Sequence, residues 1–127
     1  MEKLKQREVK YRAWDIKNKT MEDVEELFFH PDGFIIVQYL GKEYFDNIAG
    51  VDCILLEYTG LKDKNGKEIY EGDIVKYIKY DGVPYFGNVE WDKSDEGCVD
   101  CGIASGFYIK RPCECEVAGN IYENPEL

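Results

Sequence analysis

The sequence predicts a mainly β protein, folded as a small antiparallel barrel or sandwich. Between seven and nine short segments are apolar or alternate between apolar and polar residues, and turn-forming residues separate them at regular spacing. No segment repeats its apolar residues at the helical period over many turns, so no long helix is expected. Aromatic residues make up 14% of the chain and are mostly tyrosines, whose rings suit half-buried sheet positions.

The first strand is expected at residues 9–15, where residue types alternate. The alternation places two sets of side chains on opposite faces: Val9, Tyr11 and Ala13 against Lys10, Arg12 and Trp14. Residues 15–20 are polar and rich in turn formers, which predicts a hairpin loop. The acidic segment 21–27 fits one helical turn or a solvated strand end, and its pattern does not decide between them.

A second hairpin is expected around Pro31, Asp32 and Gly33. Proline fixes φ and glycine accepts a positive φ, so this tripeptide predicts a tight turn. A β-branched and aromatic strand follows at 34–40, and a short strand is expected to begin at 44–45.

The central part of the chain has the strongest local signals. The continuous apolar run at 53–58 predicts a buried strand. Asn65 and Gly66 predict a tight turn. A bend at Gly72 and Asp73 should then feed a strand whose first residues, Ile74 and Val75, enter the core.

The last part is expected to contain three further strands. The first covers residues 85–91, with Gly87 as a candidate bulge. Residues 92–102 are polar, acidic and glycine-containing, which predicts a loop. Residues 106–109 and 116–122 are the expected final strands.

Chain length supports one domain, 1–127, with a packed core, or two very small units that share an interface. The best candidate seam is the loop-like segment 46–52. It would divide an N-terminal β region, 1–50, from a C-terminal barrel, 51–127.

The formal net charge of -10 disfavours non-specific binding to nucleic acid or to an anionic membrane. The charge is compatible with a basic partner, but simple solubility is the more common reason for such a charge. A basic stretch near the N-terminus keeps nucleic acid open as an alternative partner: Lys3, Lys5, Arg7, Lys10 and Arg12. No apolar run approaches membrane-spanning length, and residues 1–6 lack the apolar core of a signal peptide, so the cytoplasm is the expected compartment.

Four of the five cysteines cluster late in the chain: Cys98, Cys101, Cys113 and Cys115. Four thiolates can hold Zn²⁺ tetrahedrally, and residues two apart on a strand share a face, so a structural zinc site is one hypothesis. The alternatives are free thiols, with Cys115 packed as a small apolar residue, or a redox pair. No other cofactor is expected.

Catalytic signals are weak. Acidic residues such as Glu71, Asp73 and Glu90 would have to be gathered into a cleft by the fold, and 26 acidic residues make chance proximity certain. His30 is the only histidine, and no nucleophile elbow or phosphate-binding loop occurs. We therefore expect no enzyme, with an unrecognised carboxylate site as the alternative.

Trp14 shares one predicted strand face with Lys10 and Arg12, and this face is a candidate recognition surface for nucleic-acid bases or an acidic peptide. The alternative is that the stems of the two cations cover a packed Trp14.

Three segments resemble signature blocks of the YopX family of phage and prophage proteins, in family order: REVKYRAWD at 7–15, YTGLKDKNGKEIYEGDIV at 58–75 and GNIYENPEL at 119–127. The resemblance implies a phage or prophage protein in bacterial cytoplasm, with a mainly β fold made of a small SH3-type barrel and an additional N-terminal β region. It implies no established activity, and the four clustered cysteines are not part of the family pattern. Most matched residues are turn formers or core residues, and only Arg12, Trp14 and Asp15 suggest a further role.

We therefore expect a non-catalytic binding module for a protein partner, with Lys10, Arg12, Trp14 and Asp15 as candidate binding residues. Self-association is also expected to be favourable, because the edge strands of a small sheet need covering. A nucleic-acid-associated protein that uses the basic N-terminal strand remains the first alternative, and an enzyme the second.

Overall fold

The computed structural model describes residues 8–43, 45–78, 82–90 and 114–127, together with the backbone of residues 101–104 and 107–110. These parts of the chain form eleven β-strands and no α-helix. In chain order the strands are β1 (Tyr11–Asp15), β2 (Thr20–Phe29), β3 (Ile35–Tyr39), β4 (Asn47–Ile48), β5 (Cys53–Lys62), β6 (Glu68–Tyr70), β7 (Asp73–Ile78), β8 (Pro84–Asn88), β9 (Cys101–Ala104), β10 (Phe107–Lys110) and β11 (Glu116–Asn120).

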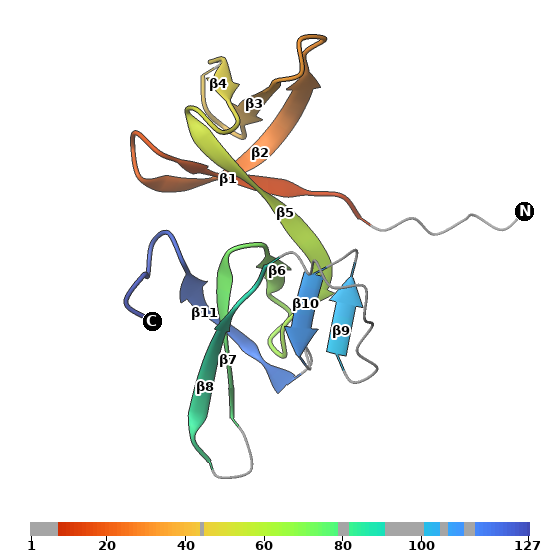
Figure 1. Ribbon diagram of the computed structural model, residues 1–127, viewed down its shortest axis with the longest axis vertical. Helices are drawn as coiled ribbons and strands as arrows, with labels where there is room; N and C mark the ends of the chain where they lie inside the picture. Colours follow the sequence, from red (N-terminus) through yellow and green to blue (C-terminus); the bar gives the residue numbers. More distant parts are fainter. Residues whose placement is uncertain (1–7, 44, 79–81, 91–100, 105–106, 111–113) are drawn as a thin grey trace, which may run out of the picture.

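The strands form three antiparallel sheets. The largest has six strands in the order β4-β3-β2-β1-β5-β6, the second has the order β11-β7-β8, and β9 pairs with β10. Figure 1 shows β1 to β4 above the two smaller sheets, with β5 running from the upper part into the lower part, where β6 lies. Strand β5 thereby links the two halves of the sequence, because it pairs with β1 on one side and with β6 on the other.

The prediction of a mainly β, antiparallel fold without a long helix is confirmed for the described residues. The predicted closed barrel is not found among the described strands. A barrel requires the first and last strands of a sheet to pair. The six-stranded sheet instead ends at β4 and at β6, which each have one strand neighbour within the described part of the chain. The SH3-type fold stays a prediction.

The first hairpin forms where the sequence predicts it. Asp15 pairs with Thr20 at the end of the β1–β2 ladder, and residues 16–19 form the turn. The Asp15 carboxylate accepts a hydrogen bond from the Asn18 amide at 2.8 Å, and Lys19 takes a positive φ of 55°. The acidic segment 21–27, whose sequence fits either a helical turn or a strand end, is part of strand β2. Its first residues pair with β1 and its later residues pair with β3.

The candidate seam at 46–52 is only partly a loop. It contains the short strand β4, which pairs with β3, and the Asp52 carboxylate accepts a hydrogen bond from the Ile48 amide at 2.8 Å. The short strand expected at 44–45 therefore begins later, at Asn47, and Tyr44 lies outside the described residues. The division into 1–50 and 51–127 stays a prediction.

The local predictions for the central segment are confirmed. Gly66 and Gly72 take positive φ values of 82° and 86°, as a tight turn and a bend require. Strand β7 begins directly after Gly72, and its residues Ile74 and Val75 are buried.

Two apolar cores support the fold. The first belongs to the six-stranded sheet and consists of Ala13, Val37, Tyr39 and Cys53. The second lies in the lower part and consists of Ile69, Val75, Val89 and Cys115. Both cysteines of these cores are buried and pack as small apolar side chains.

The C-terminal strands differ from the prediction in detail. Gly87 is no bulge, since β8 pairs with β7 in one continuous register through it. The register shift lies instead in β11, between Val117 and Gly119. Strand β8 ends at Asn88, earlier than predicted. Trp91 and residues 92–100 lie outside the described part of the chain. The last two residues of the expected loop at 92–102 belong to β9. The last two strands, β10 and β11, are present close to their predicted positions.

Candidate functional site

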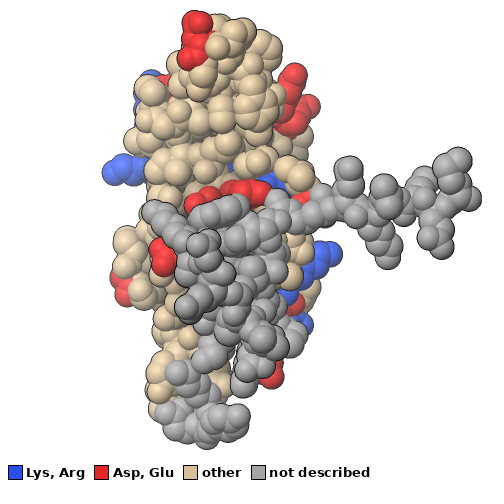
Figure 2. All heavy atoms as spheres, turned by 45° about the vertical axis from the view of Figure 1, so that its right-hand side comes forward, with Lys and Arg blue, Asp and Glu red and all other residues tan. Residues whose placement is uncertain are grey.

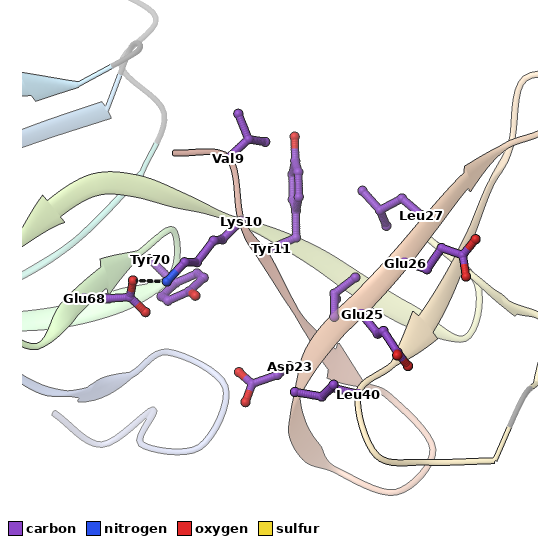
Figure 3. A pocket seen from close by; sticks show the side chains of 11 residues that line it. Val9, Lys10, Tyr11, Asp23, Glu25, Glu26, Leu27, Leu40, Glu68 and Tyr70 are labelled. Atoms are coloured by element: carbon purple, nitrogen blue, oxygen red, sulfur yellow. Dashed lines mark hydrogen bonds and ion pairs between the residues drawn. The ribbon is translucent and has the colours of Figure 1, made fainter. Parts of the chain in front are cut away.

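A groove of about 530 Å³ opens where the chain entering β1 separates from β2 (Figure 3). One wall consists of Val9, Lys10 and Tyr11, and the other consists of residues 23–27 of β2. The remaining lining residues are Leu40, Glu68 and Tyr70.

The pairing of β2 explains why the groove exists. Strand β2 pairs with β1 only as far as the pair Arg12 and Asp23, and from Val24 onward it pairs with β3. The register between β2 and β3 shifts between Val24 and Glu26, which is a bulge. Bulges bend a strand and increase its twist. The bulge thus turns β2 away from β1 and leaves a wedge between the two.

The groove has an acidic lining. Among the described residues that line it, Lys10 is the one cation, and four are acidic: Asp23, Glu25, Glu26 and Glu68. Glu68 forms an ion pair with Lys10 and raises its pKa, so the ammonium group stays charged. Among the described residues, no cation forms an ion pair with Asp23, Glu25 or Glu26. On the face shown in Figure 2, acidic side chains gather at the waist of the molecule with basic ones beside them.

Apolar side chains accompany these charges. Tyr11 and Leu27 point to the same side of the groove, whereas Asp23 and Leu40 lie on the opposite side (Figure 3). Leu40 is 56% exposed and Val9 is 64% exposed, although both are large apolar residues. Exposed apolar side chains beside unpaired charges are typical of surfaces that bind a partner.

The four predicted binding residues do not share one surface. Lys10 lines the groove. Trp14 stacks on Tyr122 with ring centroids 5.7 Å apart, which joins β1 to the C-terminal segment. Asp15 is buried and accepts a hydrogen bond from the Tyr39 hydroxyl at 2.9 Å. The combined role of Lys10, Arg12, Trp14 and Asp15 in binding stays a prediction.

Arg12 joins the large sheet to β7. Its guanidinium forms an ion pair with Asp73 and lies over the Tyr70 ring, 4.6 Å from the centroid. Asp73 is 1% exposed, and burial raises its pKa, although Arg12 and the Tyr70 amide oppose that rise. The Arg12 Nε is buried with no hydrogen-bond partner within the described structure. Arg12 therefore serves a contact inside the fold.

Asp63 occupies the turn that contains Asn65 and Gly66. Its carboxylate accepts hydrogen bonds from the amides of Asn65, Lys67 and Val117 at 2.8–2.9 Å. Burial alone would raise the pKa of Asp63, but these donors outweigh burial and hold it below its ordinary value. The Val117 bond ties the turn to β11, which lies more than fifty residues away in the sequence.

The residues named for catalysis are not brought together at the groove. Glu71 is half-buried, and burial raises its pKa. Asp73 is the partner of Arg12, and Glu90 is exposed after β8. None of the three lines the groove.

The zinc hypothesis concerns residues that are mostly outside the described structure. The described structure does not include Cys98, Cys113 or the side chain of Cys101, whose backbone belongs to β9. Cys115 is buried in the second core. The described residues contain no group of three or more possible metal ligands. The zinc site stays a prediction. Cys53 is buried beside Tyr39, and burial raises its thiol pKa.

Sequence reasoning missed most of the groove. The segment 21–27 is visibly acidic, but nothing local marks the bulge or the separation from β1. The one signal that could have indicated it is the mixture of acidic residues with Val24 and Leu27 in a segment that the structure shows to be strand.

None of the described segments forms an apolar helix of membrane-spanning length. No curated protein matches this chain. The crystal structure of protein EF1440 from Enterococcus faecalis is similar to this fold, with a TM-score of 0.62 and 28% sequence identity, over 95% of this chain and 98% of that chain. The family model for the YopX protein matches residues 10–127. The chain belongs to the YopX family.

Proposed function

We propose that this protein is a phage or prophage accessory protein that acts in the bacterial cytoplasm as a non-catalytic binding module. Its groove between β1 and β2 receives a cationic, partly apolar segment of a protein partner. The proposal invokes no metal and no cofactor.

One observation carries the proposal. The groove combines three carboxylates that have no cationic partner among the described residues with exposed apolar side chains. Opposite charges across an interface guide encounter and fix register, while apolar contacts supply most of the affinity. A lysine- or arginine-containing segment with apolar residues between its cations meets both requirements.

The charges also favour protein over nucleic acid as the partner. The described cations of the N-terminal strand are already in ion pairs, Lys10 with Glu68 and Arg12 with Asp73. A phosphate backbone would have to break these pairs and approach the acidic lining of the groove.

The proposal is tested by titrating ¹⁵N-labelled protein with a short soluble peptide in which lysine alternates with valine. The largest amide shifts are expected at Val9–Tyr11 and at residues 23–27, the two walls of the groove. A peptide in which glutamate replaces lysine serves as the matched control and should cause no shifts.

Shifts spread over the whole acidic surface would contradict the proposal, because they would indicate attraction by net charge alone. Shifts confined to another surface, such as β7 and β8, would also overturn it. Raising the salt concentration should weaken binding at the groove, because the carboxylates there are accessible to counterions.

A further inference from the structure

We propose that the groove binds its partner as an extended strand, which pairs with the open backbone edge of β2. This inference rests on the proposed function and adds the conformation of the bound segment. Three features of β2 and its surroundings support it.

First, the groove borders the edge of β2, as its consecutive lining residues indicate. Five residues in a row, 23–27, line it. Successive side chains of a strand point to opposite faces, so a groove over one face would be lined by alternate residues. Consecutive residues line a groove only when it lies beside the strand, or where a bulge changes the alternation. The bulge affects one position, between Val24 and Glu26, and does not account for the whole run.

Second, the backbone of β2 is paired on one side only over its second half. From Val24 to Phe29 its described partner is β3, and the pairing with β1 ends at Asp23. An edge strand presents unpaired N–H and C=O groups that can accept another strand. Addition of a peptide strand to such an edge is a common recognition mode.

Third, different side chains lie on the two sides of the groove, and an extended peptide with alternating residue types could contact both. Tyr11 and Leu27 are found on one side and Asp23 on the other (Figure 3). The carboxylates of Glu25 and Glu26 extend from β2 away from Lys10 in the same view. Alternate residues of a bound strand point to opposite faces, so the apolar residues would meet Tyr11 and Leu27 while the cations between them lie on the face of Asp23.

The test compares two peptides by isothermal titration calorimetry against the full chain. The first is the lysine–valine peptide, and the second has the same sequence with N-methyl groups on two adjacent central residues. Methylation keeps every side chain and charge but removes backbone donors on both edges of the peptide. We expect the methylated peptide to bind about tenfold more weakly or worse, because one of the two lost donors would face β2 and its methyl group would also hold the two backbones apart.

Hydrogen exchange of the β2 amides gives an independent readout without any change to the protein. The amides of residues 24–29 should become more protected when the unmethylated peptide binds. Equal affinity of the two peptides, without new protection in β2, would overturn the strand-pairing inference and leave the groove as the binding site. If neither peptide shifts the groove residues, the proposed function itself fails.

Discussion

The acidic residues of this protein fall into two regions that differ in their partners. In the lower part, the carboxylates of Asp63 and Asp73 are buried and are held by backbone amides or by Arg12. Beside β2, the carboxylates of Glu25 and Glu26 are exposed and have no cationic partner among the described residues. A buried carboxylate that loses its donors destabilises the fold, whereas an exposed one can be lost without such a cost. The difference indicates that the first region maintains the structure, while the carboxylates of the second are exposed and contribute little to it, as the proposed binding role requires.

Within the first region, the two aspartates differ from one another. Asp63 organises its own turn and the nearby β11 through three amide donors, and its pKa is lowered. Asp73 joins β7 to Arg12 on β1, and burial raises its pKa. The first residue stabilises a local turn, while the second connects two sheets.

The largest effect is expected from the substitution Asp73→Ala. It leaves the Arg12 guanidinium buried without its partner, and loss of one member of a buried ion pair costs about 3–5 kcal/mol. The free energy of unfolding, measured by urea denaturation, should fall by that amount.

The double substitution Arg12→Met with Asp73→Leu should recover part of this loss, since apolar replacement removes both charges together. A loss below about 1 kcal/mol for Asp73→Ala would show that the pair does not hold the sheets together.

A smaller effect is expected from Asp63→Ala. The substitution removes the buried acceptor of three backbone donors, and at about 0.5–1.5 kcal/mol for each hydrogen bond the free energy of unfolding should fall by about 1–3 kcal/mol. The matched variant Asp63→Asn keeps one oxygen acceptor and should lose less. Urea denaturation of both variants measures this, and equal stability of Asp63→Ala and the wild type would contradict the role given to Asp63.

Opposite pH dependence of the two aspartates is expected next. Both have an ordinary pKa of 3.8. The lowered pKa of Asp63 gives stability that is present above pH 3.8 and lost as pH falls through the pKa of the folded state. The raised pKa of Asp73 gives a contribution that is present below pH 3.8 and lost as pH rises through the folded-state pKa.

Carboxyl ¹³C chemical shifts followed from pH 7 to acid measure both values directly. The midpoint of Asp63 should lie below 3.8 and that of Asp73 above it. Midpoints on the same side of 3.8 would remove the distinction between the two residues.

The sequence predicts the turns of this fold well, because their causes are local. Asn65 with Gly66, and Pro31 with Gly33, set the backbone angles of their own turns, and neither depends on distant residues. The alternation of residues 9–15 likewise predicts a strand, and both of its faces are covered, Ala13 by the first core and Trp14 by Tyr122.

Long-range features could not be predicted in the same way. The pairing of Arg12 with Asp73 spans 61 positions, and the identity of the two residues does not specify it. The bulge in β2 depends on how β1 and β3 compete for one strand, so the groove beside it has no local signature. Of the candidate binding residues, Lys10 alone reaches the groove, because the side chains of Arg12, Trp14 and Asp15 find partners inside the fold.

The smallest effect on stability, and the largest on binding, is expected from Glu25→Gln combined with Glu26→Gln. Exposed carboxylates without partners contribute little to the fold, so the free energy of unfolding should change by less than about 0.5 kcal/mol. The variant Glu43→Gln combined with Glu126→Gln is the matched control, because it removes two exposed carboxylates that do not line the groove.

The affinity of the lysine–valine peptide for these two variants, measured by calorimetry, tests the central claim most directly. We expect Glu25→Gln with Glu26→Gln to bind about tenfold more weakly than the wild type, a difference of about 1.4 kcal/mol, while the control binds like the wild type. Equal weakening in both variants would mean that net charge attracts the peptide and that the groove between β1 and β2 is not its site.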